Sequence, residues 1–239
     1  MNEFKEGYIH SIETMGLVDG PGIRIVIFMQ GCPLRCIFCH NPETWTKKSK
    51  NKMTSNQIVD IIRKYRPYIE LGGGVTFSGG EPLFQSEFLL ETLTMCKKAG
   101  IHTCIDTSGT GYDKKYLDEI LKRTDLVILD IKAIDENSYK KITGKEITEF
   151  NYFVDKLTKH NKKIWLRQVI IPKINDTEEY ILNLKEYIKK FKNVEKIELL
   201  PYHTLGKEKY EKLNIKYRLS EILDMDKEKC KKLQELLNK

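Results

Sequence analysis

Short apolar runs alternate with amphipathic segments along most of the 239 residues. Runs rich in β-branched residues are typical of buried strands. They predict strands over residues 7–14, 23–29, 74–78, 101–107, 126–131, 164–171 and 194–200. Apolar residues at helical spacing predict helices over residues 54–69, 86–99, 113–122, 149–160, 176–191 and 227–238. This alternation amounts to about six β/α units and predicts a parallel sheet with helical crossovers.

The predicted helices have recognisable ends. Thr54 is followed three residues later by Gln57, which is the spacing of a capping box. Gly100 is placed to end the helix before it in the left-handed conformation. Asp176 and Thr177 precede two glutamates and are expected to begin the helix that runs to about residue 191.

Length and composition indicate one soluble globular domain over residues 1–239, with 40% hydrophobic and 31% charged residues. The first six residues contain no basic segment leading into an apolar run, so we expect no signal peptide. No run is apolar and long enough to span a bilayer. We therefore expect a cytoplasmic protein whose six cysteines are reduced thiols or metal ligands rather than disulfides.

The formal net charge is +7, and most of it comes from lysines, including those in the loop of residues 47–52. A solvated lysine-rich surface explains this charge most simply. The alternative is a patch that steers an acidic redox partner. The sequence contains nothing that resembles a nucleic-acid-binding module, and no aromatic residues alternate with the basic runs.

Three cysteines lie within one loop, at the spacing C-x₃-C-x₂-C formed by Cys32, Cys36 and Cys39. Thiolates are ligands for iron–sulfur clusters and for zinc. A cubane cluster takes four ligands, so this loop would leave one iron for a non-protein ligand. A zinc site would need a second cysteine or histidine pair, and none is nearby. The spacing resembles the cluster loop of the radical S-adenosylmethionine (SAM) superfamily, in which SAM binds the fourth iron.

Polar residues follow the carboxyl ends of the predicted strands, which is where parallel β/α barrels place their chemistry. The groups are Cys32, Ser78 to Glu81, Asp106 with Thr107, Asp130 with Lys132, and Pro201 to His203, with Arg167 inside the fifth strand. Each has a structural alternative: a tight turn for the glycines, caps or ion pairs for the aspartates, and a surface cation for Lys132. Cys96, Cys104 and Cys230 are expected to be ordinary thiols.

A closer resemblance covers nearly the whole chain. The sequence resembles the glycyl-radical-enzyme activases of the radical SAM superfamily. The stretches that carry the resemblance are Val18 to Arg24, the cysteine loop ending in Cys39 to Pro42, Gly72 to Leu83, Asp106 to Gly109, Leu129 to Lys132, and Leu199 to His203. No cysteine lies between Asn41 and Ser78, which favours the type with a single cluster over relatives with a ferredoxin-like insert.

The resemblance implies a fold, cofactors and site residues. The fold is a partial (β/α)6 TIM-like barrel, and the cofactors are a [4Fe-4S] cluster on Cys32, Cys36 and Cys39, SAM, and a monovalent cation. SAM would contact Phe38, Cys39, His40, Gly79, Gly80, Glu81, Asp130, Ile131, Lys132 and His203. The cation would lie beside Asp106, Thr107 and Asp130. Asp19 and His40 would face the substrate. Glu81 could receive the ammonium group of SAM, and Lys132 its carboxylate.

The implied activity is that of an oxidoreductase that reductively cleaves SAM and takes a hydrogen atom from a backbone glycine of a protein substrate. The expected substrate is pyruvate formate-lyase, with anaerobic ribonucleotide reductase as the alternative glycyl radical enzyme. Flavodoxin or ferredoxin is the expected electron donor, with no role for nucleic acid or a membrane. Two other classes remain open: an electron-transfer protein, which would need no SAM motif, and a zinc-dependent binding module.

Overall fold

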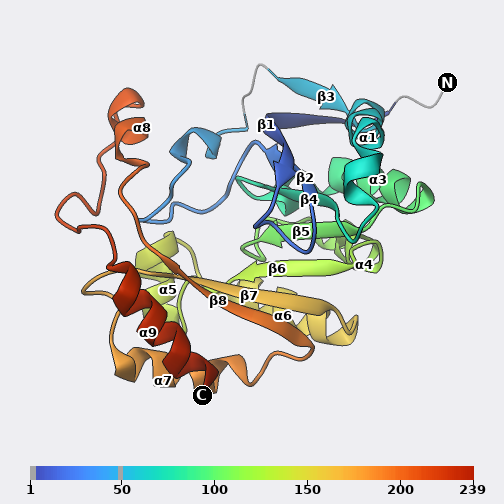
Figure 1. The fold of residues 1–239 in the computed structure, drawn as a ribbon. Helices are drawn as coiled ribbons and strands as arrows, with labels where there is room; N and C mark the ends of the chain where they lie inside the picture. The colour runs from blue at the N-terminus through green and yellow to red at the C-terminus, as the bar shows by residue number, and fades with distance from the viewer. Residues whose placement is uncertain (1–3, 48–50) are drawn as a thin grey trace.

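The computed structural model describes residues 4–47 and 51–239, and its strands form one sheet with the order β3-β1-β2-β4-β5-β6-β7-β8 (Figure 1). The neighbouring strands β2, β4, β5, β6, β7 and β8 run parallel to one another. Strand β1 pairs antiparallel with both β2 and β3. Their bounds are β1 Glu6–Gly16, β2 Arg24–Met29, β3 Lys52–Thr54, β4 Gly74–Gly79, β5 Thr103–Thr107, β6 Leu126–Asp130, β7 Lys163–Ile170 and β8 Val194–Pro201.

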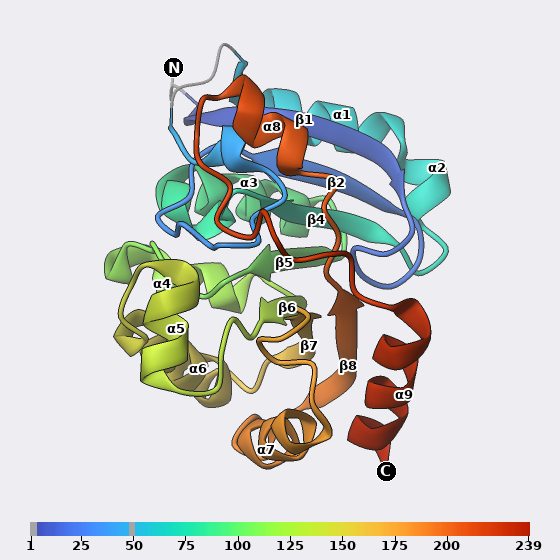
Figure 2. The ribbon, with the colours of Figure 1, turned by 90° about the vertical axis from the view of Figure 1, so that its left-hand side faces the viewer.

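Helices cover the convex side of this curved sheet, as the view along the strands shows (Figure 2). Their bounds are α1 Ser55–Lys64, α2 Arg66–Ile69, α3 Ser86–Lys98, α4 Lys114–Lys122, α5 Glu136–Thr143, α6 Thr148–Lys159, α7 Glu178–Ile188, α8 Lys207–Lys212 and α9 Lys227–Asn238. Helix α9 packs against β8 and α7. Because no pairing joins β3 to β8 among the described residues, the sheet is an open, partial (β/α)6 barrel, as predicted.

The two faces of the sheet have different interiors because successive side chains of a strand point to opposite faces. The helix-facing side carries the main hydrophobic core, which includes Ile105, Val127 and Leu166. On the concave face, Cys104, Ile128 and Trp165 form a smaller apolar cluster. Two residues further along the same strands, this face presents Asp106, Asp130 and Arg167. The alternation thus places an apolar floor beneath a charged rim.

The main strands and helices lie where the hydrophobic pattern predicts them, with differences at ends and in short elements. The capping box of Thr54 and Gln57 is present, and Gly100 has a positive φ of +71°. The helix predicted over 54–69 is broken at Tyr65, because Pro67 in the first turn of α2 cannot continue the hydrogen bonding of α1. Of Asp176 and Thr177, which were expected to begin the next-to-last helix, Thr177 caps α7.

Three short elements were not predicted: β3, α5 and α8. Each is too short to show a periodic pattern of its own. Within the lysine-rich loop of residues 47–52, residues 48–50 lie outside the described residues, and Lys52 begins β3. Across the described ranges, every helix is too short or too polar to cross a membrane.

Candidate active site

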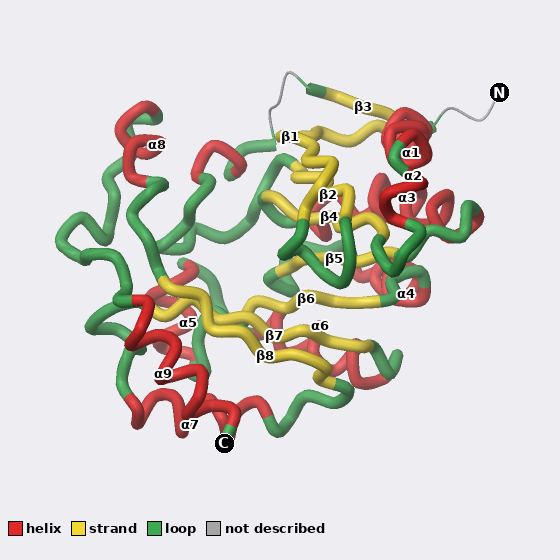
Figure 3. Tube along the Cα trace, viewed as in Figure 1, coloured by secondary structure: helices red, strands yellow, loops and turns green. Residues whose placement is uncertain are grey.

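A cavity of about 580 Å³ opens at the carboxyl ends of the strands. The loops that surround it lie on the same side of the molecule as α8 (Figure 3). The predicted site residues that line it are Asp19, Cys32, Cys36, Phe38, Cys39, His40, Gly79, Gly80, Asp106, Thr107, Asp130, Lys132 and His203. Glu81 and Ile131 do not line it. The groups expected to converge on one site from separate strands therefore do so, apart from these two side chains.

The cysteine loop is fixed to its surroundings through its backbone. The amide of Arg35 donates to the carbonyl of Thr143 at 2.8 Å, and the amide of Ile37 donates to that of Ile142 at 2.9 Å. On the other side, the Tyr210 hydroxyl donates to the carbonyl of Cys39 at 2.9 Å. The loop is thus held between the C-terminal end of α5 and the helix α8, two elements that the hydrophobic pattern did not reveal.

All three loop thiols are buried enough to resist ionisation. Burial raises the pKa of Cys32 and Cys39, and it raises that of Cys36 to about 11 although the charge of Lys132 opposes it. Thiols must lose a proton when they bind a metal, and the burial of these groups opposes that loss. Such burial limits access of water to a bound metal group.

The thiols fit a cluster in their placement. They line one wall of the same cavity. Across the described ranges, however, no three His, Cys, Asp or Glu side chains come close enough to bind a single metal ion. A cubane cluster does not require such convergence, because each thiolate binds a different iron atom. The donor set and its shared cavity therefore suit a cluster with one iron left open.

The glycines of the Gly79-Gly80 turn are needed because of backbone packing. Gly79 has a φ of +109°, and a Cβ there would lie 2.3 Å from the amide nitrogen of Met29. A Cβ on Gly80 would lie 2.4 Å from the carbonyl oxygen of Gly31. Because Gly31 precedes Cys32, a side chain at Gly80 would displace the cysteine loop itself. Backbone packing thus requires glycine at both positions, whether or not a ligand approaches them.

Glu81 is fully buried, and its carboxylate faces protein donors rather than the cavity. It accepts hydrogen bonds from the hydroxyl of Thr107, from the amide and hydroxyl of Ser108, and from the amide of Leu83. Burial raises its pKa to about 7, while these hydrogen bonds act in the opposite direction. Its side chain therefore ties the loop after β4 to the loop after β5. The side chain of Ile131 likewise lies in the core.

Four charged groups crowd the rim of the cavity. Lys132 donates to Asp130 at 2.7 Å and lies 5.4 Å from the centre of the Phe38 ring. Burial alone would lower the pKa of Lys132, but the charges of Asp130, Cys36 and Asp106 raise it above its usual value. Burial, and after it the charge of Asp130, raises the pKa of Asp106 to about 6, against the effect of Arg167. The carboxyl groups of Asp106 and Asp130 thus share this rim, and the positive charges of Lys132 and Arg167 do not fully offset the effect of burial and repulsion on Asp106.

Asp19 reaches the cavity from the loop between β1 and β2. Its backbone carbonyl accepts a hydrogen bond from the Thr76 hydroxyl at 2.6 Å, and Arg167 donates to the neighbouring carbonyl of Val18. Burial raises the pKa of Asp19, while Arg167 lowers it. Across the cavity, the rings of His40 and His203 touch edge to face at 4.4 Å. Burial, and then His203, lowers the pKa of His40.

The sequence did not reveal the roles of several cavity and support residues. Ser78 lines the cavity and donates to Asp106 at 2.8 Å, and Ser108 holds Glu81. Arg167 was noticed only as a polar residue inside a strand. Ser108 lies within a stretch that carried the family resemblance, but a serine beside a glycine is too common in turns to be singled out. Tyr210 belongs to α8, which the pattern did not predict.

Known proteins similar to this chain were found in sequence and in structure. A profile of the Radical SAM superfamily matches residues 26–185. The chain is 54% identical over 232 residues to the pyruvate formate-lyase-activating enzyme of Clostridium pasteurianum, covering 97% of each chain. It is 44% identical over 240 residues to the pyruvate formate-lyase-activating enzyme of Staphylococcus epidermidis, covering 98% of this chain and 96% of that one.

Solved structures show the same fold. SuiB of Streptococcus suis bound to S-adenosylmethionine aligns with a TM-score of 0.65 at 18% identity, over 87% of this chain and 45% of that one. A domain of a pyruvate-formate lyase-activating enzyme from Bacteroides vulgatus aligns with a TM-score of 0.56 at 25% identity, over 70% of this chain and 94% of that one.

Proposed function

The chain belongs to the Radical SAM superfamily and, within it, to the pyruvate formate-lyase-activating enzymes, and on this premise we propose that it activates pyruvate formate-lyase by removing a hydrogen atom from a backbone glycine. The observation that carries the proposal is the convergence of the three loop thiols, the Gly79-Gly80 turn and the Asp106 and Asp130 carboxylates on one cavity. We also propose that residues 1–239 act as a single radical SAM domain.

Membership of the superfamily implies a [4Fe-4S] cluster and SAM, and we assign Cys32, Cys36 and Cys39 as the cluster ligands. When bound, the cluster and SAM would supply one-electron cleavage of the SAM sulfonium into methionine and a 5′-deoxyadenosyl group that takes up the glycine hydrogen atom. The chain's own part is to hold the reacting groups in place and to exclude water. The buried Cys36 and the half-buried Cys32 and Cys39, which line the cavity of the concave face, suit that task.

For SAM we propose contacts with Phe38, Cys39, His40, Gly79, Gly80, Glu81, Asp130, Ile131, Lys132 and His203. The ammonium group of Lys132 supplies a cation for the SAM carboxylate. Because the side chains of Glu81 and Ile131 do not reach the cavity, we assign them a role through the backbone and through the position of their loops. The ammonium group of SAM is then left to Asp130 and to main-chain oxygens.

We further propose a monovalent cation beside Asp106, Thr107 and Asp130. The raised pKa of Asp106, caused by burial and by the charge of Asp130, supports it, because a bound cation would relieve the repulsion between the two carboxylates. Oxygen ligands suit hard cations of this kind. Asp19 and His40, which line the same cavity, are the proposed contacts with the substrate glycine loop.

Flavodoxin or ferredoxin is the proposed electron donor, and the cytoplasm the proposed compartment, since the cluster needs reduced thiols to assemble. We assign no part to nucleic acid or to a membrane. These proposals rest on the family to which the chain belongs.

The test of the proposed function is anaerobic reconstitution of the cluster, followed by incubation with SAM, a one-electron reductant and a candidate partner. A glycyl radical seen by electron paramagnetic resonance on pyruvate formate-lyase is the expected result. A radical on anaerobic ribonucleotide reductase alone would overturn the proposed substrate, while SAM cleavage without any glycyl radical would overturn the activase function.

A further inference from the structure

Four exposed cations lie against the cysteine loop without facing the cavity. They are Arg35, Lys47, Lys145 and Arg218, and we refer to them as the basic face. None of the four lines the cavity that holds the loop thiols. The cysteine loop therefore has a cavity on its inner side and a charged surface on its outer side.

Contacts between separate parts of the chain bring three of these cations together. The guanidinium of Arg218, in the segment between α8 and α9, donates to the backbone carbonyl of Arg35. A Cβ on Gly144, the residue that ends α5, would lie 3.8 Å from the Cβ of Arg35. Because Lys145 follows Gly144 directly, its backbone begins beside Arg35 as well.

Lys47 joins the basic face from the other end of the cysteine loop. Its side chain comes within 3.1 Å of the position that a Cβ would take on Gly31, the residue before Cys32. Its ammonium group lies 3.9 Å from the centre of the Phe84 ring. The cations thus flank the segment from Gly31 to Arg35, which contains the first of the three thiols.

The charge of the basic face is not neutralised within the chain. Glu43 and Glu146 are the acids nearest in sequence to Lys47 and Lys145, but they pair with other lysines at 2.7 Å and 2.6 Å. Among the described residues, no carboxylate pairs with any cation of the basic face. A group of unpaired cations attracts a surface of opposite charge and directs how it docks.

Arg35 connects this surface to the cysteine loop by hydrogen bonds. Its guanidinium donates to the carbonyls of Cys32 at 2.8 Å and Leu34 at 2.7 Å, and it lies 5.0 Å from the centre of the Trp45 ring. A guanidinium has five N–H groups, so donors remain for a carboxylate of another protein. Such a carboxylate would be separated from the backbone of Cys32 by one side chain. Because electron tunnelling weakens steeply with distance, a redox protein docked here would be well placed.

We propose that the basic face is the docking surface for an acidic one-electron carrier protein, which reduces the cluster from the outer side of the cysteine loop. The carrier loses one electron, the bound cluster takes it up, and no atom passes between the proteins. The cavity then stays free for SAM and for the substrate. The inference rests on the proposed function, from which it takes the cluster ligands and the need for an electron donor.

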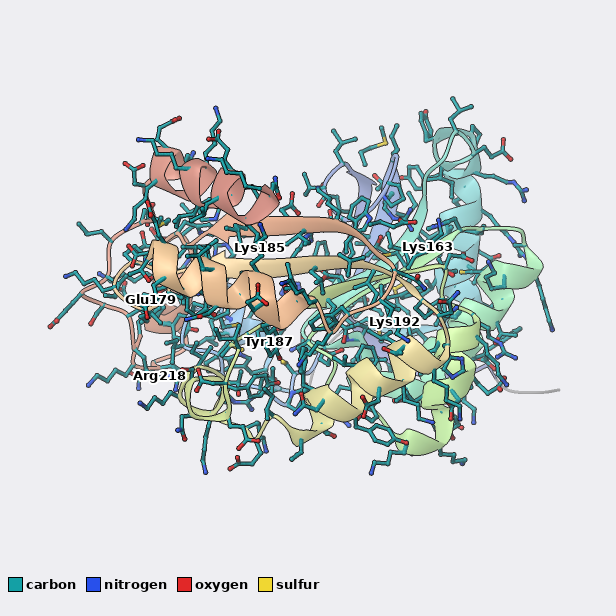
Figure 4. The ribbon with its side chains drawn as sticks, turned by 90° about the horizontal axis from the view of Figure 1, so that it is seen from below. Lys163, Glu179, Lys185, Tyr187, Lys192 and Arg218 are labelled. Atoms are coloured by element: carbon teal, nitrogen blue, oxygen red, sulfur yellow. The ribbon has the colours of Figure 1, made fainter. Side chains whose placement is uncertain are left out.

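The test uses charge reversal at Lys47 and Lys145, whose ammonium groups form no hydrogen bond with described residues, so that the contacts of the loop are kept. Lys192→Glu is the matched control. Lys192 is exposed in the loop that precedes β8, and it lies toward the opposite end of the strands from Arg218 (Figure 4). Each substitution changes the net charge of +7 by the same amount, so any difference reports the position of the charge.

Binding of an acidic flavodoxin to the reconstituted enzyme is measured by titration calorimetry. Lys47→Glu and Lys145→Glu should each raise the Kd roughly threefold to thirtyfold at low salt, whereas Lys192→Glu should stay near the wild type. At about 1 M salt, where the Debye length is about 3 Å, the difference should vanish. Cleavage of SAM driven by flavodoxin hydroquinone should fall in the two variants, and cleavage driven by dithionite should not, because dithionite needs no docking surface.

The proposal is overturned if Lys47→Glu and Lys145→Glu bind flavodoxin as Lys192→Glu does, or if cleavage driven by dithionite falls as much as cleavage driven by flavodoxin. It is also overturned if the two variants bind flavodoxin normally and pyruvate formate-lyase more weakly, since the basic face would then belong to the protein substrate. Expected flavodoxin binding and SAM cleavage without any glycyl radical would instead overturn the proposed function and leave the docking surface in place.

Discussion

At the scale of single residues, the six cysteines fall into two groups that substitution should separate. Cys32, Cys36 and Cys39 line the cavity, whereas Cys96, Cys104 and Cys230 are buried and do not line it. We predict that alanine at any one of the first three removes most cluster iron and abolishes SAM cleavage, because each thiolate binds its own iron. Cys96→Ala and Cys230→Ala should keep both. Iron analysis and chromatography of 5′-deoxyadenosine measure the two quantities. Loss of the cluster in Cys96→Ala with retention in Cys36→Ala would contradict the assignment.

Glu81 leads to a prediction about pH. Burial raises its pKa in the folded chain to about 7 from an ordinary value of 4.5, so the folded state binds more protons than the unfolded state between these values. Stability attributable to Glu81 is then present at the acid side of this window and is lost as the pH rises through it. The loss should be on the order of 3 kcal/mol. Glu81→Gln cannot titrate and should not show it.

The measurement is urea unfolding of the iron-free protein at several pH values across that window. The wild type should lose free energy of unfolding relative to Glu81→Gln as the pH rises. Glu235→Gln, which changes an exposed carboxyl of α9, should behave as the wild type does. Parallel curves for the wild type and Glu81→Gln would show that the carboxylate stays ionised in its hydrogen-bonded setting.

Sequence could predict the residue types at the site better than the direction of each side chain. The cysteine spacing and the polar residues after successive strands were enough to place Asp106, Asp130 and Lys132 in one cavity. They could not show that Glu81 faces Thr107 and Ser108, since that depends on how two loops from different strands meet. The same holds for Arg218, whose contact with the carbonyl of Arg35 is visible only in three dimensions.

At the scale of elements, length determined what could be predicted. Strands and helices of several turns repeat their apolar pattern often enough to be recognised, and β2 and α9 lie close to or at their predicted bounds. The helix α8 has six residues, mostly charged, with Tyr210 buried against the cysteine loop. Its position comes from tertiary contacts rather than from its own pattern, so the sequence alone did not reveal it.

Arg24 connects the loop before β2 to the sheet, and its loss should be costly. Its side chain is fully buried and donates to the carbonyls of Pro21 and Val75 and to the hydroxyl of Thr76. Arg24→Met keeps much of the apolar stem but leaves these acceptors without their donor, which should cost about 2–4 kcal/mol of stability. Because Thr76 in turn holds the carbonyl of Asp19, the loop that carries Asp19 should also loosen.

Urea unfolding of the iron-free chain measures the loss, and amide hydrogen exchange in the segment between β1 and β2 reports the loosening. Arg63→Met is the matched control, since Arg63 is exposed on α1 and pairs with Asp60 at 3.3 Å. It should change stability by no more than about 0.5 kcal/mol. Equal effects of the two substitutions would mean that the buried network contributes nothing beyond a surface ion pair.

At the scale of the whole molecule, the open sheet and its cavity bear on the size of the substrate. An open sheet exposes the carboxyl-end cavity at its rim, where the loop that carries Asp19 meets the loop that carries His203. Near this rim, Leu17, Val18 and Leu205 are each more than two-thirds exposed. An exposed apolar rim around the cavity suits a folded partner that inserts one loop, rather than a free small molecule.

This shape leads to the last prediction, which concerns Asp19. A carboxylate at the rim can accept backbone N–H groups of an inserted peptide, and such charge-assisted hydrogen bonds contribute about 1.5–3 kcal/mol. Asp19→Asn should therefore raise the KM for a glycine-loop peptide by roughly tenfold to a hundredfold, since each 1.4 kcal/mol is a factor of ten. Cleavage of SAM without peptide should persist, because Asp19 is assigned to the substrate and not to the cluster. Asp118→Asn, which changes a half-buried carboxyl on α4 that pairs with Lys156 and does not line the cavity, should leave both unchanged. With a peptide deuterated at the glycine α-carbon, deuterium should appear in 5′-deoxyadenosine, at wild-type extent per radical formed once the peptide is saturating.

If deuterium stays in the peptide for every glycyl radical enzyme sequence tested, or if Asp19→Asn stops SAM cleavage itself, then Asp19 belongs to the cofactor site and the substrate enters elsewhere.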